Sequence, residues 1–189
     1  EFRRVLFRSI YGLGLWLPTL IKQFGGTDLV TGFVSAVPYI FGIIGLLIIP
    51  RSSDRLNDRY GHLAVLYVLG AIGLFFSAWL SVPVLQMAAL CLAAFAMFSC
   101  TAVFWTLPGR FFAGASAAAG IALINSVGNL GGYIGPFVIG ALKEYTGNLA
   151  SGLYFLSAVM VFGLLLTGVV YRLLERKHVL PADQFAASA

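Results

Sequence analysis

The ionised side chains with the clearest chemical potential lie in one short segment, RSSDRLNDR at 51–59. Its Asp54, Arg55 and Arg59 are close enough in the chain for a carboxylate to pair with a neighbouring guanidinium. Such a carboxylate can pair with a basic residue or a helix N-terminus in one conformation and separate from it in another. The segment therefore indicates either a conformational gate or a solvated loop whose charges only set orientation.

A second group of polar side chains offers neutral hydrogen bonds within apolar sequence. Asn125 and Asn129 lie one helical turn apart in such a stretch. An amide in hydrocarbon is costly without a partner, so each is expected to bond to another helix or to face a water-filled cavity. In the second case they would contact a substrate. Tyr11 and Tyr39 lie deep in their apolar runs and are candidates for lining the same cavity.

The sequence offers little for covalent or metal chemistry. It has no Ser/His/Asp set, no phosphate-binding loop and no Cys/His spacing typical of a metal site. Cys91 and Cys100 lie nine residues apart in one apolar run and are expected to pack against other apolar side chains. We therefore expect a protein that is not an enzyme and that needs neither a metal nor another cofactor.

The elements that would position these residues are long apolar runs. A helix needs about 20 apolar residues to cross the hydrocarbon core of a bilayer. Hydrophobic residues make up 60% of the chain and charged residues 10%. A soluble domain has about 45–50% apolar and about 25% charged residues. The composition predicts an all-α integral membrane protein. Six spans are expected, at 10–24, 29–50, 62–80, 84–106, 115–142 and 149–171, with the first one short.

Glycines are concentrated in the fifth run. Gly128, Gly131, Gly132 and Gly135 recur at i, i+3, i+4 and i+7, which places them on one stripe of a helix. Small residues spaced in this way allow the backbones of two membrane helices to approach closely. We expect this stripe to be a helix-packing surface.

The basic residues predict which side of the membrane each loop occupies, because cytoplasmic loops carry an excess of Lys and Arg. Lys22 and Lys143 fall on one side. Seven fall on the other: Arg51, Arg55, Arg59, Arg110, Arg172, Arg176 and Lys177. The segments 51–61, 107–114 and 172–189 are therefore expected in the cytoplasm, with a cytoplasmic tail at 176–189. The basic balance is explained by topology, so no nucleic-acid partner is expected.

Three blocks of the chain resemble a known family. YGLGLWLPTLIKQFG (11–25), SAVPYIFGIIG with SDRLNDR (35–45 and 53–59), and the long block 104–155 resemble the anion:cation symporters of the major facilitator superfamily. That family includes phthalate, tartrate, hydroxyphenylacetate and sugar-acid permeases. The resemblance implies that residues 10–175 are the C-terminal six-helix half, a 3+3 repeat, of a twelve-helix fold. The loop signature departs from the pattern at Pro50 and Asn57, where the superfamily has Gly, and at Asp58, where it has a basic residue.

The first nine residues, EFRRVLFRS, are expected to be non-native. They match one reading frame of a common sequencing adapter without interruption. We therefore leave 1–9 out of the fold and expect the natural chain to begin upstream, with an N-terminal six-helix half that this sequence lacks.

The resemblance implies a secondary active transporter in the bacterial plasma (inner) membrane. Its expected activity is proton-coupled uptake of a small organic anion, a carboxylate or sugar acid, by alternating access. The expected partners are that anion, protons, the lipid bilayer and the missing half. No acid or base here lies mid-span. The resemblance implies that the key Arg and carboxylates belong to the missing half. An efflux or neutral-solute permease, or a non-transporting membrane sensor or assembly subunit, remain alternatives.

Overall fold

The computed structural model describes residues 28–107 and 115–176. This part of the chain consists of helices joined by short turns, as expected for an all-α protein. The helices are α2 (Asp28–Arg55), α3 (Arg59–Trp79), α4 (Pro83–Trp105), α6 (Ala115–Thr146) and α7 (Ala150–Arg176). The expected first span at 10–24, Arg110 and the tail from residue 177 lie outside the described residues.

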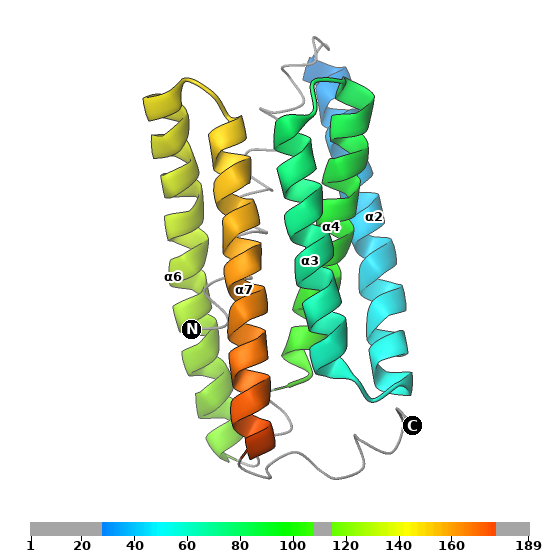
Figure 1. The fold of residues 1–189 in the computed structure, drawn as a ribbon, viewed down its shortest axis with the longest axis vertical. Coiled ribbons are helices and arrows are strands. Elements are labelled where there is room, and N and C mark those ends of the chain that lie inside the picture. Colours follow the sequence, from blue (N-terminus) through cyan, green and yellow to red (C-terminus); the bar gives the residue numbers. More distant parts are fainter. Residues whose placement is uncertain (1–27, 108–114, 177–189) are drawn as a thin grey trace.

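The five helices stand side by side in the order α6, α7, α3, α4, α2 (Figure 1). The α3 helix packs between α7 and α4, and α4 packs between α3 and α2. The turn after α2, the end of α4, the start of α6 and the end of α7 share one end of the bundle (Figure 1). The described helix ends that flank the three segments expected in the cytoplasm therefore lie at the same end of the bundle.

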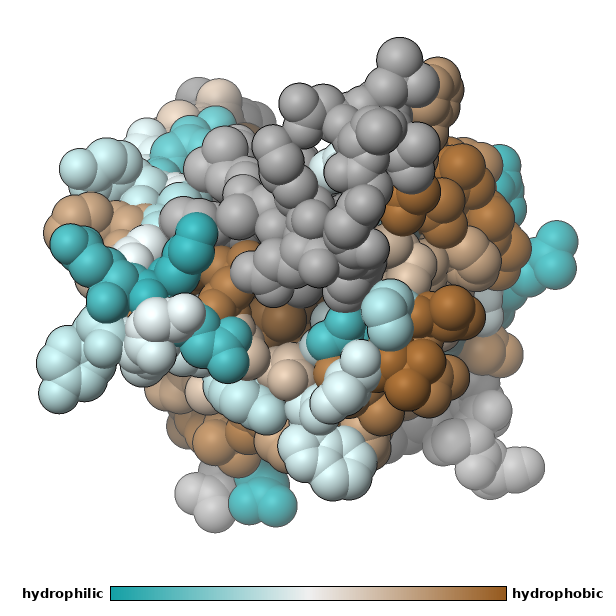
Figure 2. All heavy atoms as spheres, turned by 90° about the horizontal axis from the view of Figure 1, so that it is seen from above, coloured by the Kyte–Doolittle hydropathy of each residue, from teal (hydrophilic) through white to brown (hydrophobic). Residues whose placement is uncertain are grey.

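Each described helix is long and apolar enough to cross a membrane. Large apolar side chains remain on the outside of the bundle, including Leu123 at 69% and Phe137 at 67% exposure. Figure 2 looks onto the end with the α3–α4 and α6–α7 turns and shows hydrophobic residues reaching the surface between hydrophilic patches. An exposed apolar surface of this extent suits lipid, so this is a multi-pass membrane protein.

The helices continue further into the polar segments than the sequence predicts. Residues 51–55 are the last residues of α2, so the expectation of a loop at 51–59 is wrong for this part, and only 56–58 connect the two helices. The α6 helix likewise runs to Thr146, and α7 runs to Arg176. Hydropathy marks where a helix leaves the hydrocarbon, whereas the backbone can remain helical beyond that point. Arg55 and Lys143 lie in final turns, where a positive charge favours the helix.

Local capping groups explain where the next helices begin. Asp58 precedes α3, and its carboxylate accepts a hydrogen bond from the Gly61 backbone N–H at 2.8 Å. Gly147, with φ +68°, ends α6 in the left-handed conformation that glycine adopts at little cost. The Asn148 side chain then accepts a hydrogen bond from the Ala150 N–H at 2.9 Å at the start of α7. These groups supply the partners that helix ends otherwise lack.

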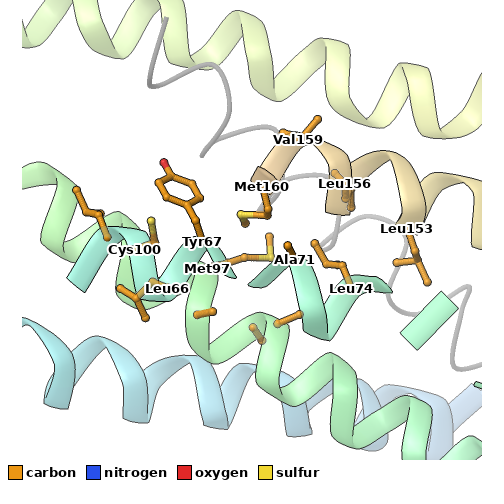
Figure 3. Close-up of a cluster of buried hydrophobic side chains, with 14 of the residues drawn as sticks. Leu66, Tyr67, Ala71, Leu74, Met97, Cys100, Leu153, Leu156, Val159 and Met160 are labelled. Carbon is orange, nitrogen blue, oxygen red and sulfur yellow. The ribbon is translucent and has the colours of Figure 1, made fainter. Parts of the chain in front are cut away.

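The hydrophobic core lies where α3, α4 and α7 meet (Figure 3). Met97 of α4 and Met160 of α7 lie beside the small Ala71 of α3, and all three are buried. The core also contains polar contacts, and in one of them the Ser157 hydroxyl donates to the Ala71 carbonyl at 2.8 Å. The bond joins α7 to α3 and satisfies a hydroxyl that would be costly to leave unpaired in hydrocarbon.

Single glycines permit the closest helix crossings of α4. A Cβ at Gly73 in α3 would lie 2.7 Å from the Ala93 backbone nitrogen and 2.8 Å from the Ala89 carbonyl oxygen. A Cβ at Gly45 in α2 would lie 2.8 Å from the Phe95 carbonyl oxygen. The longer glycine stripe of the fifth run predicts neither crossing. The available signal was a pair of glycines three residues apart in each helix, at 42 and 45 and at 70 and 73.

The Gly73 crossing predicts a specific loss of stability. Gly73→Ala should lower the free energy of unfolding by about 1–3 kcal/mol, because the new methyl group meets backbone atoms that cannot move aside. Gly168→Ala in α7 is the matched control, since a Cβ there meets nothing within 4 Å. Thermal unfolding of the purified protein in detergent measures the effect. Equal midpoints for the two variants would contradict the close crossing.

Candidate functional site

The candidate site centres on Arg59, whose side chain connects three helices at the end of the bundle that carries the 56–58 turn. From the start of α3, its Nη2 pairs with Asp54 Oδ1 of α2 at 2.8 Å. Its Nε donates a hydrogen bond to Thr106 Oγ1, just after α4, at 2.7 Å. The Thr106 hydroxyl in turn donates to the Val103 carbonyl at 2.7 Å. One guanidinium therefore joins the ends of α2 and α4.

Burial makes this ion pair more consequential than an ordinary surface pair. The Arg59 side chain is 14% exposed, although that of Asp54 is 57% exposed. Among the described residues, Arg59 Nη1 is buried without a hydrogen-bond partner. Removing the Asp54 carboxylate would withdraw the acceptor from a second nitrogen of the same guanidinium, and unpaired buried donors are costly.

The turn between α2 and α3 explains two departures from the loop signature. Asn57 has φ +48°, a left-handed conformation in which Gly is most common and Asn is the next most tolerated residue. Asn57 stands where the superfamily pattern has Gly, and its backbone has a conformation that Gly also adopts readily. Asp58 replaces a basic residue and caps the N-terminus of α3, which is a favourable place for an acid.

Further hydrogen bonds hold the last turn of α2 against the start of α3. The Ser53 hydroxyl donates to the Asp58 carbonyl at 3.1 Å, and Ser52 Oγ lies 3.2 Å from His62 Nε2. His62 Nδ1 lies 2.5 Å from the same Asp58 carbonyl oxygen. Two of the three predicted gate residues, Asp54 and Arg59, form an ion pair. The third, Arg55, is exposed and belongs to none of the described ion pairs.

The predicted packing glycines and substrate amides lie on different faces of α6. Gly128, Gly131 and Gly135 are buried and Gly132 is partly buried, whereas Asn125 and Asn129 are exposed. Ile139, one helical repeat further along the buried stripe, contacts Gly152 so closely that a Cβ there would lie 2.6 Å from its Cγ2. Among the described helices, α6 contacts only α7. The contact between Ile139 and Gly152 joins α6 to α7, and the two amides are exposed on a different face of α6 from the buried glycines.

The other candidate contacts are not brought together with these amides. Tyr39 is half-buried on α2 and makes an edge-on contact with Phe98 of α4, with ring centroids 6.0 Å apart. The α2 and α6 helices lie at opposite edges of the described row (Figure 1). Tyr11 lies outside the described residues. The structure thus leaves Tyr39 packed against α4 and the two Asn side chains uncovered on α6.

The arrangement favours conformational change over reaction chemistry. The described charged side chains lie at helix ends, so the span interiors that the structure describes carry none. Within the same residues, no three His, Cys, Asp or Glu side chains are grouped to hold a metal ion. What the site can do is make or break an ion pair that links three helix ends.

Comparisons with known proteins agree with this architecture. The model of the Major Facilitator Superfamily matches residues 5–187. The chain is 74% identical over 170 residues to a "Quinolone resistance transporter" of Acinetobacter baumannii. The matched segment covers 89% of this chain and 39% of that protein.

Two more distant relatives are also named as transporters. A "Putative tartrate transporter" of Agrobacterium vitis is 39% identical over 87% of this chain and 36% of its own length. An inner membrane transport protein of Escherichia coli K12 is 35% identical over 93% of this chain and 40% of its own. The chain thus spans about two fifths of the length of these relatives, as a partial transporter fold would. This chain belongs to the major facilitator superfamily.

Proposed function

We propose that the complete protein is a secondary transporter that takes up a small organic anion across the bacterial inner membrane by alternating access, driven by protons. The observation that carries the proposal is the superfamily match over residues 5–187. The relative named for tartrate supports a carboxylate as the substrate, because tartrate is a dicarboxylate. A relative placed by its name in the Escherichia coli inner membrane supports the location.

The described helices would supply the neutral part of the substrate site. Burying a carboxylate in a membrane without a countercharge is very costly. Since the described span interiors carry no charge, we infer that the countercharge belongs to an N-terminal half outside this chain. Substrates of such transporters bind near the midplane between two halves. Asn125 and Asn129, exposed on α6, are suited to contact the substrate from this side.

The Arg59 network would serve as the gate of this half. It joins the ends of α2, α3 and α4, so helix movement at this end must stretch or break its bonds. Arg51, Arg55 and Arg172 lie at the same end, whereas Lys143 lies at the other. The excess of basic residues supports a cytoplasmic location for this end. We infer that the pair of Arg59 and Asp54 holds the cytoplasmic ends together in one state and separates in the other.

Efflux of a quinolone is the second candidate function. The observation that favours it is 74% identity to a protein named for quinolone resistance. Quinolone antibacterials carry a carboxylate on an aromatic ring system, so the two candidates share one substrate chemistry and differ in size and direction. A site that binds either compound needs the same countercharge. Direction of transport therefore separates them.

Transport by the complete protein in liposomes tests the proposal. With an inward proton gradient, labelled tartrate or a sugar acid should accumulate, and a protonophore should abolish the accumulation. In cells, the same protein should leave quinolone accumulation unchanged. Lower quinolone accumulation without carboxylate uptake would establish the efflux candidate instead. No transport in either assay would favour a non-transporting role.

The two amides on α6 should affect transport more than folding. Asn125→Ala and Asn129→Ala should each lower carboxylate uptake about tenfold, since a lost hydrogen bond to a charged group is worth about 1.5–3 kcal/mol. Protein yield should be unchanged because neither side chain is covered by a described helix. Leu130→Ala, an exposed apolar truncation on the same helix, is the control. If both Asn variants lose yield along with activity, their role is structural.

The gate predicts that Arg59 and Asp54 act as a unit. Arg59→Gln and Asp54→Asn should each slow transport and lower the thermal midpoint, and the double variant should be little worse than either single variant. Arg172→Gln removes an exposed charge on α7 at the same end of the bundle, and it should change neither transport nor the thermal midpoint. Uptake rates and unfolding midpoints measure both effects. Additive losses in the double variant would show that the two side chains act independently.

A further inference from the structure

Two arginines near the end of α2 form a basic groove separate from the Arg59 network. Arg51 and Arg55 lie one turn apart, and both are exposed. With Ile48, Ser52 and Leu56 they line an open groove of about 410 Å³. The Arg51 Nη1 donates to the Leu47 carbonyl of its own helix, which holds this guanidinium alongside α2. The groove is thus built from two positive charges and apolar side chains.

The positive charge of the groove is not balanced by the nearest acids. The Asp54 carboxylate pairs with Arg59, and the Asp58 carboxylate caps the start of α3. Neither Arg51 nor Arg55 belongs to an ion pair among the described residues. Two adjacent guanidinium groups without a carboxylate attract an anion, and their planar donors suit the oxygens of a phosphate.

The apolar part of the groove points to a lipid rather than a soluble anion. Ile48 is 55% and Leu56 is 61% exposed beside the arginines. Further along α2 toward the membrane interior, Ile44 and Leu47 are also exposed. A soluble anion would use only the guanidinium groups and leave this surface bare. A phospholipid would place its headgroup on the arginines and an acyl chain along α2.

We propose that this groove binds the phosphate headgroup of an anionic phospholipid, such as phosphatidylglycerol or cardiolipin. Basic pockets at the cytoplasmic ends of membrane helices are suited to such headgroups. The site uses Arg51 and Arg55, which are not part of the Arg59 network. The two functions proposed for this end of α2 therefore depend on different side chains.

Native mass spectrometry of the complete purified protein with added lipid tests the proposal. Phosphatidylglycerol and cardiolipin should bind more tightly than phosphatidylcholine. The double variant Arg51→Gln/Arg55→Gln should weaken their binding at least about tenfold, as expected for the loss of two basic residues at an anionic headgroup. Arg172→Gln on α7 should change binding less than about twofold. Anionic lipid should also raise the thermal midpoint of the unmodified protein more than that of the double variant.

Three results would overturn the proposal. The first is unchanged lipid binding in the double variant, which would indicate that another part of the complete protein covers the groove. The second is an equal loss in Arg172→Gln, which would indicate a diffuse charge effect. The third is glycerol 3-phosphate binding as tightly as the lipids, which would make the groove a site for soluble anions. If the double variant does not fold, Arg51→Lys/Arg55→Lys replaces it. That variant keeps the charge but not the planar donors, and it should still bind anionic lipid measurably more weakly than the unmodified protein.

Discussion

The absence of water in the hydrocarbon core is the constraint on which the rest of this structure depends. Every backbone N–H and C=O in that region must find its partner within the chain, so the described spans are continuous helices. Hydroxyl groups follow the same requirement: those of Ser35, Ser99 and Thr167 donate to the carbonyl one turn back in their own helix. Charged groups cannot be satisfied in this way, which confines them to the helix ends. Ion-pair chemistry and membrane crossing are therefore separated along each helix.

Within that constraint, α4 organises the described bundle. It is the helix most enclosed by its neighbours, with α3 on one side and α2 on the other. Its contacts rely on small residues, such as Ala93 opposite Gly73, because lipid offers no hydrophobic drive for helices to associate. The same three helices are joined again at the Arg59 network. The same three helices are thus held twice, by close packing along the spans and by an ion pair at their ends.

The sequence predicted the helices well and the tertiary contacts poorly. Long apolar runs identify membrane helices because the bilayer thickness fixes their length, and all five described spans lie where they were expected. Their ends were misplaced at residues 51–55 and 143–146, because hydropathy reports the edge of the lipid and not the end of the backbone hydrogen bonds. The pairing of Asp54 with Arg59 lay within reach of sequence spacing. The bond from Arg59 to Thr106 did not, because it depends on how α4 packs beside α3.

The backbone of Asn57 has a consequence for how this hairpin can diverge through evolution. Its left-handed conformation, φ +48°, restricts which single substitutions the turn accepts. An exchange between Asn and Gly keeps the turn, whereas a β-branched residue would have to rebuild it and would draw Arg59 away from its partners. Selection at residue 57 then acts on the backbone dihedral angle that the turn requires. At the neighbouring residue 58 the side chain caps a helix, a role that Ser, Thr and Asn also fill, so a different and wider set of residues is tolerated there.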